Sequence, residues 1–164
     1  MLRIAAALAG LALLASCATS PSISPQARSE LAPTGKIRVA INFGNANFAR
    51  RDAKGEPGGI AVDLARELAL RSGIPVELVG YPSAARLTAA VNSGAWDIAF
   101  IAYAQAREKE ITFPAAFAQV DGTYLVPANS PFRDAAEVDR AGVRIAVAAK
   151  GGNELFLSRS IKQA

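Results

Sequence analysis

Polar and apolar residues alternate over 36–41, in the order K-I-R-V-A-I, directly after a Pro-Thr-Gly sequence. A period of two residues is typical of a β-strand with one buried face. Apolar residues then recur at four-residue spacing and predict a helix over 60–71. Gly73 and Pro75 follow that helix and are expected to end it. The folded part of the chain is therefore expected to begin with a strand and an amphipathic helix.

Two further strands, over 76–79 and 98–102, and a second helix, over 84–91, follow from patterns of the same kind. Strands that alternate with helices across short loops predict βαβ units and a parallel sheet. An open parallel sheet binds its ligands at the carboxyl edge. The loops 42–48 and 102–107 are therefore the candidate binding loops.

The pattern after residue 121 is less complete. The elements expected there are two strands, a helical turn and a helix, over 122–127, 143–148, 135–139 and 153–162. One clear β-loop-α module is too little to cover both faces of its own sheet. We therefore expect an α/β fold with one nearly complete lobe over 35–124 and an incomplete second lobe over 125–164.

Residues 1–16 have the pattern of an export signal. Arg3 gives a positive start, and 4–14 is an uninterrupted run of Ile, Ala, Leu and Gly that is too short for a permanent membrane helix. The run ends in L-A-S-C, which resembles a bacterial lipobox, and Cys17 is the only cysteine. We predict a signal peptide over 1–16 and a lipid on Cys17 that tethers the protein to a membrane on its extracytoplasmic or periplasmic side. The alternative is an ordinary cleavage site with a cysteine there by chance.

The segment 17–34 is rich in Ser, Pro and Thr. Such a composition is typical of flexible linkers. We predict a flexible stalk between the lipid and the folded body.

The composition excludes several kinds of site. Without histidine, and with one cysteine, the 164 residues cannot form a Ser-His-Asp triad, a Cys-His pair, an imidazole-bound zinc or an internal disulfide. The net charge is +4, but the only tight basic group is Arg50, Arg51 and Lys54. Binding along nucleic-acid phosphates needs basic residues gathered on one face. We expect no nucleic-acid partner, no metal and no cofactor.

Five sequence motifs follow one another along the chain, and their order is as informative as their residues. They are D-x-K-G-E at 52–56, G-I-x-V-D-L-A-x-E-L-A at 59–69, the helix, Gly turn and strand of 87–99, Arg107 with Phe113-Pro114, and G-T-Y-L-V-P at 122–127 before V-R-I-A-V at 143–147. In this order the sequence resembles bacterial extracellular solute-binding proteins of family 3, the amino-acid-binding type of ABC transporters. The resemblance implies a periplasmic-binding-protein type II fold. In that fold two lobes close on a small solute, which is passed to the permease of an ABC importer.

The resemblance also implies which residues bind the solute. Arg107 matches the family arginine that holds a ligand carboxylate, a role suited to the two-pronged guanidinium. The alternative is a surface arginine in the charged segment R-E-K-E. The other candidate ligand-binding residues are Asn42, Phe43, Asn45, Tyr103, Gly152 and Asn153. The alternatives for Gly152 and Asn153 are an ordinary turn and a helix N-cap.

Several positions depart from the family pattern. Asn42 stands where amino-acid binders often carry an Asp for the ligand ammonium, and Asn45 where many carry a stacking aromatic residue. Family members place Ser or Thr hydroxyls around the ligand carboxylate, and the corresponding stretch of this sequence has Ala99, Phe100, Ala102 and Ala104. Fewer side-chain hydrogen bonds imply a different solute or weaker binding.

Three further residues are expected to be structural. They are Phe48 in the core, Trp96 at the rim of the sheet and Asp97 at the start of a strand.

The leading hypothesis is a non-enzymatic solute-binding component of an ABC importer for amino acids or related small carboxylates. One alternative is an enzyme similar to cyclohexadienyl dehydratase, in which Glu154 is the only acid near the second-lobe loop. Another is a sensory or cell-wall-enzyme module, which no fused segment supports. Because family members continue beyond the matched part, we also expect a truncated chain that binds weakly or not at all, so a non-functional fragment is a further alternative.

Overall fold

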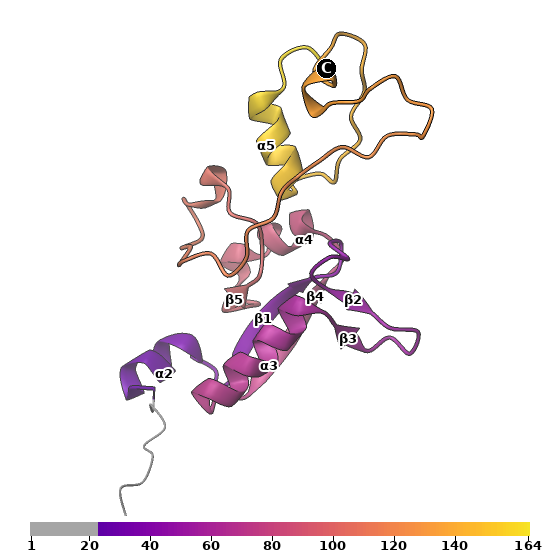
Figure 1. Ribbon diagram of the computed structural model, residues 1–164. Coiled ribbons are helices and arrows are strands. Elements are labelled where there is room, and N and C mark those ends of the chain that lie inside the picture. The colour runs from indigo at the N-terminus through magenta and orange to yellow at the C-terminus, as the bar shows by residue number, and fades with distance from the viewer. Residues whose placement is uncertain (1–22) are drawn as a thin grey trace, which may run out of the picture.

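The alternating segment after residue 36 forms the central strand of a parallel sheet in the computed structural model, which describes residues 23–164 (Figure 1). Strand β1 (Ile37–Asn42) lies between β4 (Val76–Tyr81) and β5 (Ile98–Ala99), and both neighbours run parallel to it. The inward side chains of β1 are fully buried, since Ile37, Val39 and Ile41 have no exposed surface. The predicted parallel sheet is confirmed, although β5 ends three residues earlier than expected.

Helix α3 (Ile60–Ser72) covers this sheet as its spacing predicted. Ala61, Val62 and Ala65 form its buried face and join the core cluster with β1. Gly73 ends the helix in the left-handed conformation with φ of 62°, and its N–H donates to the carbonyl of Ala69. The predicted second helix is shorter and consists of α4 (Ala84–Ala89) followed by the 3₁₀ turn η1 (Val91–Ser93).

A short antiparallel ribbon projects from the loop between β1 and α3. It consists of β2 (Arg50–Arg51) and β3 (Pro57–Gly58), which pair across the D-x-K-G-E turn. The carboxylate of Asp52 closes the turn by accepting the N–H groups of Lys54 and Glu56, each at 2.8 Å.

The predicted flexible stalk is wrong for the part that the structure describes. Helix α2 (Pro25–Leu31) begins at a proline, and the hydroxyl of Ser24 caps it by accepting the N–H of Ala27 at 3.1 Å. Arg28 fastens the helix to the body by donating to the carbonyls of Ser72 and Gly73 at 3.4 and 3.3 Å. Cys17 and the predicted signal peptide lie outside the described residues.

The chain after β5 has fewer regular elements than expected, in particular in the second unit, residues 125–164. The 3₁₀ turns η2 (Gln105–Arg107) and η3 (Ala135–Glu137) and helix α5 (Gly152–Ser160) form, but neither 122–127 nor 143–148 is a strand. A strand needs hydrogen-bonding neighbours, and residues 23–164 provide none for these two segments. Leu125 is fully exposed as a result. The α/β architecture with an incomplete second lobe is confirmed.

One partly buried ion pair holds the start of β5 against β1. The Nε and Nη2 atoms of Arg38 donate to the two carboxylate oxygens of Asp97 at 2.9 and 2.6 Å, and the Arg38 backbone N–H donates to Oδ2 at 2.8 Å. The side chains of Arg38 and Asp97 are 20% and 10% exposed. Asp97 is therefore a structural residue, as predicted. Its neighbour Trp96 has a buried indole N–H that meets no acceptor among residues 23–164.

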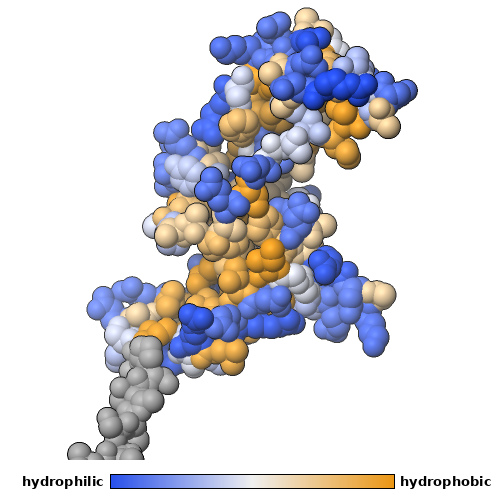
Figure 2. Space-filling model, in the orientation of Figure 1, coloured by the Kyte–Doolittle hydropathy of each residue, from blue (hydrophilic) through white to orange (hydrophobic). Residues whose placement is uncertain are grey.

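Figure 2 shows hydrophobic residues gathered over the middle of the molecule, hydrophilic residues over the β2–β3 ribbon, and both kinds mixed over the second unit. Across residues 23–164, none of the helices has the length and apolar character needed to cross a membrane.

Candidate functional site

Arg107 is buried where the two parts of the chain meet. It lies in η2, which follows β5 along the chain. The residue as a whole is only 7% exposed. Its Nη1 donates to the carbonyl of Ala102 on the sheet side, and its Nη2 donates to the carbonyl of Lys150 in the second unit at 2.7 Å. The alternative of an exposed surface arginine is therefore wrong.

The guanidinium of Arg107 has no carboxylate within 4.0 Å among residues 23–164. Burial lowers the pKa of Arg107 from its ordinary value, because removal from water disfavours the charged form. An arginine carries five N–H donors, of which two have partners here. A buried cation with three remaining donors is suited to an anionic ligand.

The second unit approaches Arg107 through a tight turn. Lys150 has a φ of 53°, an uncommon value for a residue other than glycine, and its carbonyl faces Arg107. At Gly152 a Cβ atom would lie 2.6 Å from the Cβ of Ala102, so only glycine allows α5 to start this close to the sheet edge. Gly152 therefore supports the site through its missing side chain.

The candidates at the end of β1 and in the loop after it make mainly local contacts. The Oδ1 atom of Asn42 accepts the N–H of Gly44 at 3.0 Å. Asn45 is exposed, and its carbonyl accepts the N–H groups of Phe48 and Ala49 at 3.0 Å. Phe43 is half-buried and lies beneath the guanidinium of Arg51.

Tyr103 and Asn153 are both exposed. The hydroxyl of Tyr103 donates to Glu108 at 2.8 Å, which raises the Tyr103 pKa, and the ring packs edge-on against Phe113. Asn153 is exposed and lies inside α5, whose N-cap is Gly151, so the N-cap alternative for Asn153 is wrong.

Phe48 belongs to an aromatic cluster with Phe100 and Phe117. The ring of Phe117 meets the rings of Phe48 and Phe100 edge-on, at centroid distances of 6.0 and 5.4 Å. Phe48 is only half-buried, so it packs beside the sheet instead of in the main core predicted for it.

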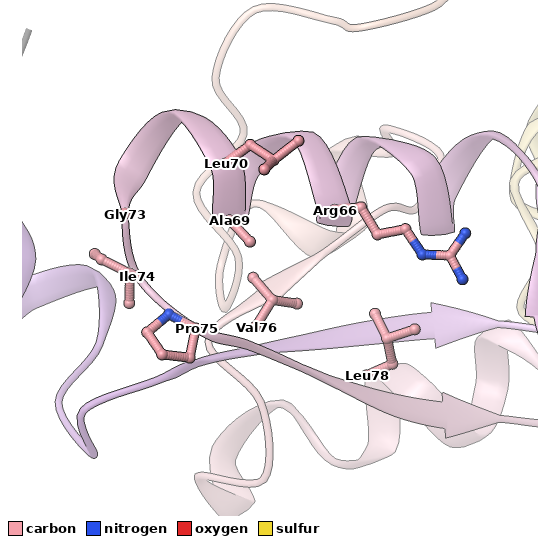
Figure 3. A pocket seen from close by; sticks show the side chains of 8 residues that line it. All are labelled: Arg66, Ala69, Leu70, Gly73, Ile74, Pro75, Val76 and Leu78. Atoms are coloured by element: carbon pink, nitrogen blue, oxygen red, sulfur yellow. The ribbon is translucent and has the colours of Figure 1, made fainter. Parts of the chain in front are cut away.

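An apolar groove of about 560 Å³ lies away from Arg107, at the opposite end of the sheet. Figure 3 shows side chains from the end of α3 and the start of β4 along it, with Arg66 at one end. A ligand site at the carboxyl edge of the sheet is formed where the strands end. This groove is lined instead by the first residues of β4. Arg107, rather than the groove, therefore marks the candidate binding site.

Residues 37–158 match the family model of bacterial extracellular solute-binding proteins, family 3. The chain belongs to this family. The match covers both the sheet that ends at the candidate site and the turn that carries Lys150. Comparison with curated proteins gives no match.

Solved structures of solute-binding proteins have the same fold. An ancestral amino acid-binding protein, a precursor of cyclohexadienyl dehydratase, superimposes with a TM-score of 0.69 at 22% identity, over 81% of this chain and 60% of that chain. A putative binding component of an ABC transporter from Wolinella succinogenes DSM 1740, complexed with lysine, gives 0.63 at 22% identity, over 80% and 57%. An ancestral cyclohexadienyl dehydratase gives 0.51 at 26% identity, over 87% and 60%. The chain thus spans about 60% of the length of such family 3 relatives.

Two features of this site were not predicted from the sequence. The carbonyls of Ala102 and Lys150 hold Arg107, and a main-chain carbonyl leaves no signature in residue type. Arg51 stands over Phe43 at the sheet edge, and the available signal was the tight basic group in which it occurs.

Proposed function

We propose that this family 3 protein binds a small solute through a carboxylate, as the solute-binding component of an ABC importer. The observation that carries the proposal is Arg107, a residue only 7% exposed, whose guanidinium is held by carbonyls from both parts of the chain and has no carboxylate partner among residues 23–164. Amino acids and related small carboxylates are the proposed solutes.

The geometry suggests how the carboxylate is held. The carbonyls of Ala102 and Lys150 fix the plane of the guanidinium before a ligand arrives, which reduces the ordering needed on binding. The remaining N–H groups can donate to both oxygens of one carboxylate. Because Lys150 contributes from the second unit, a solute at Arg107 contacts the junction of the two parts.

The test is a calorimetric titration of the full chain with the common amino acids and small carboxylic acids, each beside its primary amide. We expect at least one acid to bind, and its amide to bind at least tenfold more weakly, because the amide has no charge for Arg107. Absence of binding by every acid, or equal binding of acid and amide, would contradict the proposal.

We propose binding without turnover. The similarity to an ancestral cyclohexadienyl dehydratase makes an enzyme the second candidate. Glu154, the acid nearest the second-lobe turn, is already engaged, because its carboxylate accepts the Lys150 N–H at 3.2 Å and the Ser158 hydroxyl at 2.8 Å. The test of this alternative is to incubate the full chain with prephenate and with arogenate. We expect both compounds to stay unconverted. Formation of the aromatic product would overturn the binding-only proposal.

We also propose that the protein acts outside the cytoplasm, attached to a membrane by a lipid on Cys17, and delivers its solute to a permease. Membership of an extracellular binding-protein family and the L-A-S-C sequence support this location.

When the full chain is produced in bacteria with radiolabelled palmitate, we expect label in the wild type and none in Cys17→Ser. The wild type should sediment with membranes and the variant should be released, because the lipid is attached through the thiol. Equal labelling of both proteins, or membrane attachment of both, would contradict the lipid anchor.

A further inference from the structure

We propose that Asp139 is a positioning residue for the candidate site, because its carboxylate holds the far end of α5 and thereby keeps the carbonyl of Lys150 on Arg107. The inference rests on the proposed function, since Arg107 is the residue assigned to the solute carboxylate. It assigns to the site a residue that acts through α5 and not by touching the solute.

The carboxylate of Asp139 accepts three consecutive backbone N–H groups just after α5. The nitrogen of Lys162 lies 3.1 and 3.0 Å from its two oxygens, and those of Gln163 and Ala164 lie 2.7 and 3.1 Å from Oδ1. These hydrogen bonds, above all the one from Gln163, lower the pKa of Asp139 from its ordinary value. Hydrogen bonds to a charged acceptor are stronger than those between neutral groups. We call Asp139 with residues 162–164 the Asp139 clasp.

The Asp139 clasp closes the chain into a loop from Asp139 to Ala164 that contains both α5 and the Lys150 turn. Asp139 itself belongs to an ordered segment, because its neighbour Val138 is only 5% exposed and η3, just before it, begins with a capping box. Closing a loop removes conformational freedom from the residues inside it. The Lys150 turn is one of the segments that the clasp restrains.

Hydrogen bonds connect α5 to Arg107 at its other end. The carboxylate of Glu154 accepts the Lys150 N–H at 3.2 Å and the Ser158 hydroxyl at 2.8 Å, so the turn and the helix are bonded to each other. The carbonyl of Lys150 accepts from Nη2 of Arg107 at 2.7 Å. Helix α5 has nine residues and forms a rigid element about 13 Å long. It is therefore held by Arg107 at its start and by the Asp139 clasp at its end.

The position of α5 depends on these polar contacts because an apolar core does not fix it. The main core cluster lies within residues 32–74 and includes no residue of the second unit. Helix α5 has no buried residue, and Phe156 on it is 62% exposed. In Figure 1 the C-terminus lies at the end of the second unit farthest from the sheet. A segment with so little apolar burial opens easily when its hydrogen bonds are removed.

The test compares Asp139→Ala with the matched control Asp121→Ala in the full chain. Asp121 is an exposed acid without an ion pair among residues 23–164. Nitrogen-15 NMR of the arginine side chains, recorded without ligand, reports the surroundings of Arg107. The signals of Arg38, which lies on β1, report whether the sheet stays intact.

We expect Asp139→Ala to shift the Arg107 Nη–H resonances and to leave those of Arg38 in place, whereas Asp121→Ala changes neither. The best carboxylate should bind Asp139→Ala roughly threefold to tenfold more weakly than the wild type, because one long side chain must then be ordered on binding.

Unchanged Arg107 resonances in Asp139→Ala, or an equal change at Arg38, would overturn the inference and leave the proposed function intact. Equal affinity of Asp139→Ala and the wild type for a carboxylate would do the same. Failure of the wild type to bind any carboxylate would overturn the proposed function, while the resonances recorded without ligand would still show whether Asp139 positions Lys150 on Arg107.

Discussion

Replacement of Asp97 by Asn should lower the free energy of unfolding by about 3 kcal/mol near neutral pH. The side chain of Asp97 is 10% exposed and accepts three hydrogen bonds from Arg38, two of them from the guanidinium. Asparagine keeps one acceptor oxygen but removes the charge, which leaves the shielded Arg38 cation without its counterion. The loss of one partner of a shielded ion pair is strongly destabilising. Urea unfolding followed by circular dichroism measures the effect.

The Asp97 effect should depend on pH. The hydrogen bond from Arg38 lowers the pKa of Asp97 below its ordinary value of 3.8, so the folded state binds this proton less readily than the unfolded state. The stabilisation is therefore complete above the ordinary pKa and is lost as the pH falls through the lower, folded-state value. The difference between wild type and Asp97→Asn should shrink over that acidic range.

Asp63→Asn is the matched control for Asp97→Asn. Asp63 pairs with Arg66 at 3.3 Å, but its side chain is 69% exposed, so its loss should cost no more than about 0.5 kcal/mol. Equal destabilisation by the two substitutions, or a pH-independent effect at Asp97, would show that the Arg38–Asp97 pair does not hold β5 to β1.

The second large effect is expected at the candidate site. Arg107→Lys should weaken binding of the best carboxylate at least tenfold, although the charge is kept. Lysine is a point charge without the planar fork, so it cannot bond the carbonyls of Ala102 and Lys150 and both oxygens of a carboxylate in one plane. Calorimetric titration of the full chain measures the loss.

Arg71→Lys is a suitable control for Arg107→Lys, because Arg71 lies in the last turn of α3 with its side chain 80% exposed. It should bind the solute as the wild type does. Unchanged affinity in Arg107→Lys, with the circular dichroism spectrum of the wild type, would remove Arg107 from the binding site.

The elements that the sequence predicted best are those whose patterns are local. The alternation over 36–41 and the four-residue spacing over 60–71 reflect one buried face each, and β1 and α3 form within one residue of those bounds. The segments 122–127 and 143–148 are also rich in strand-forming residues, but pairing decides whether such a segment becomes a strand, and no paired neighbour exists among residues 23–164.

Helix α2 was missed for a different reason. The Ser and Pro content of 17–34 indicated a linker, whereas Ser24 and Pro25 together form a helix start, a cap followed by a proline in the first turn. The order Ser24-Pro25 indicates a helix start, but the overall Ser and Pro content of the segment indicated a linker.

The candidate site was predictable only in part. Resemblance to the family pointed to Arg107, and the structure places it in a buried position at the sheet edge. The contact with Lys150 depends on a left-handed backbone turn 43 residues away and could not be read from residue types. The roles of Asn42, Phe43, Asn45, Tyr103, Gly152 and Asn153 in binding stay predictions.

The central claim is that the guanidinium of Arg107 receives the carboxylate of the solute. Its most direct test is nitrogen-15 NMR of the arginine side chains in the full chain, with the Arg107 signal assigned by its absence in Arg107→Lys. We predict that the tightest-binding acid shifts the Arg107 Nε–H and Nη–H resonances, while its amide at the same concentration leaves them in place. Binding of the acid with the Arg107 resonances unmoved would contradict the claim.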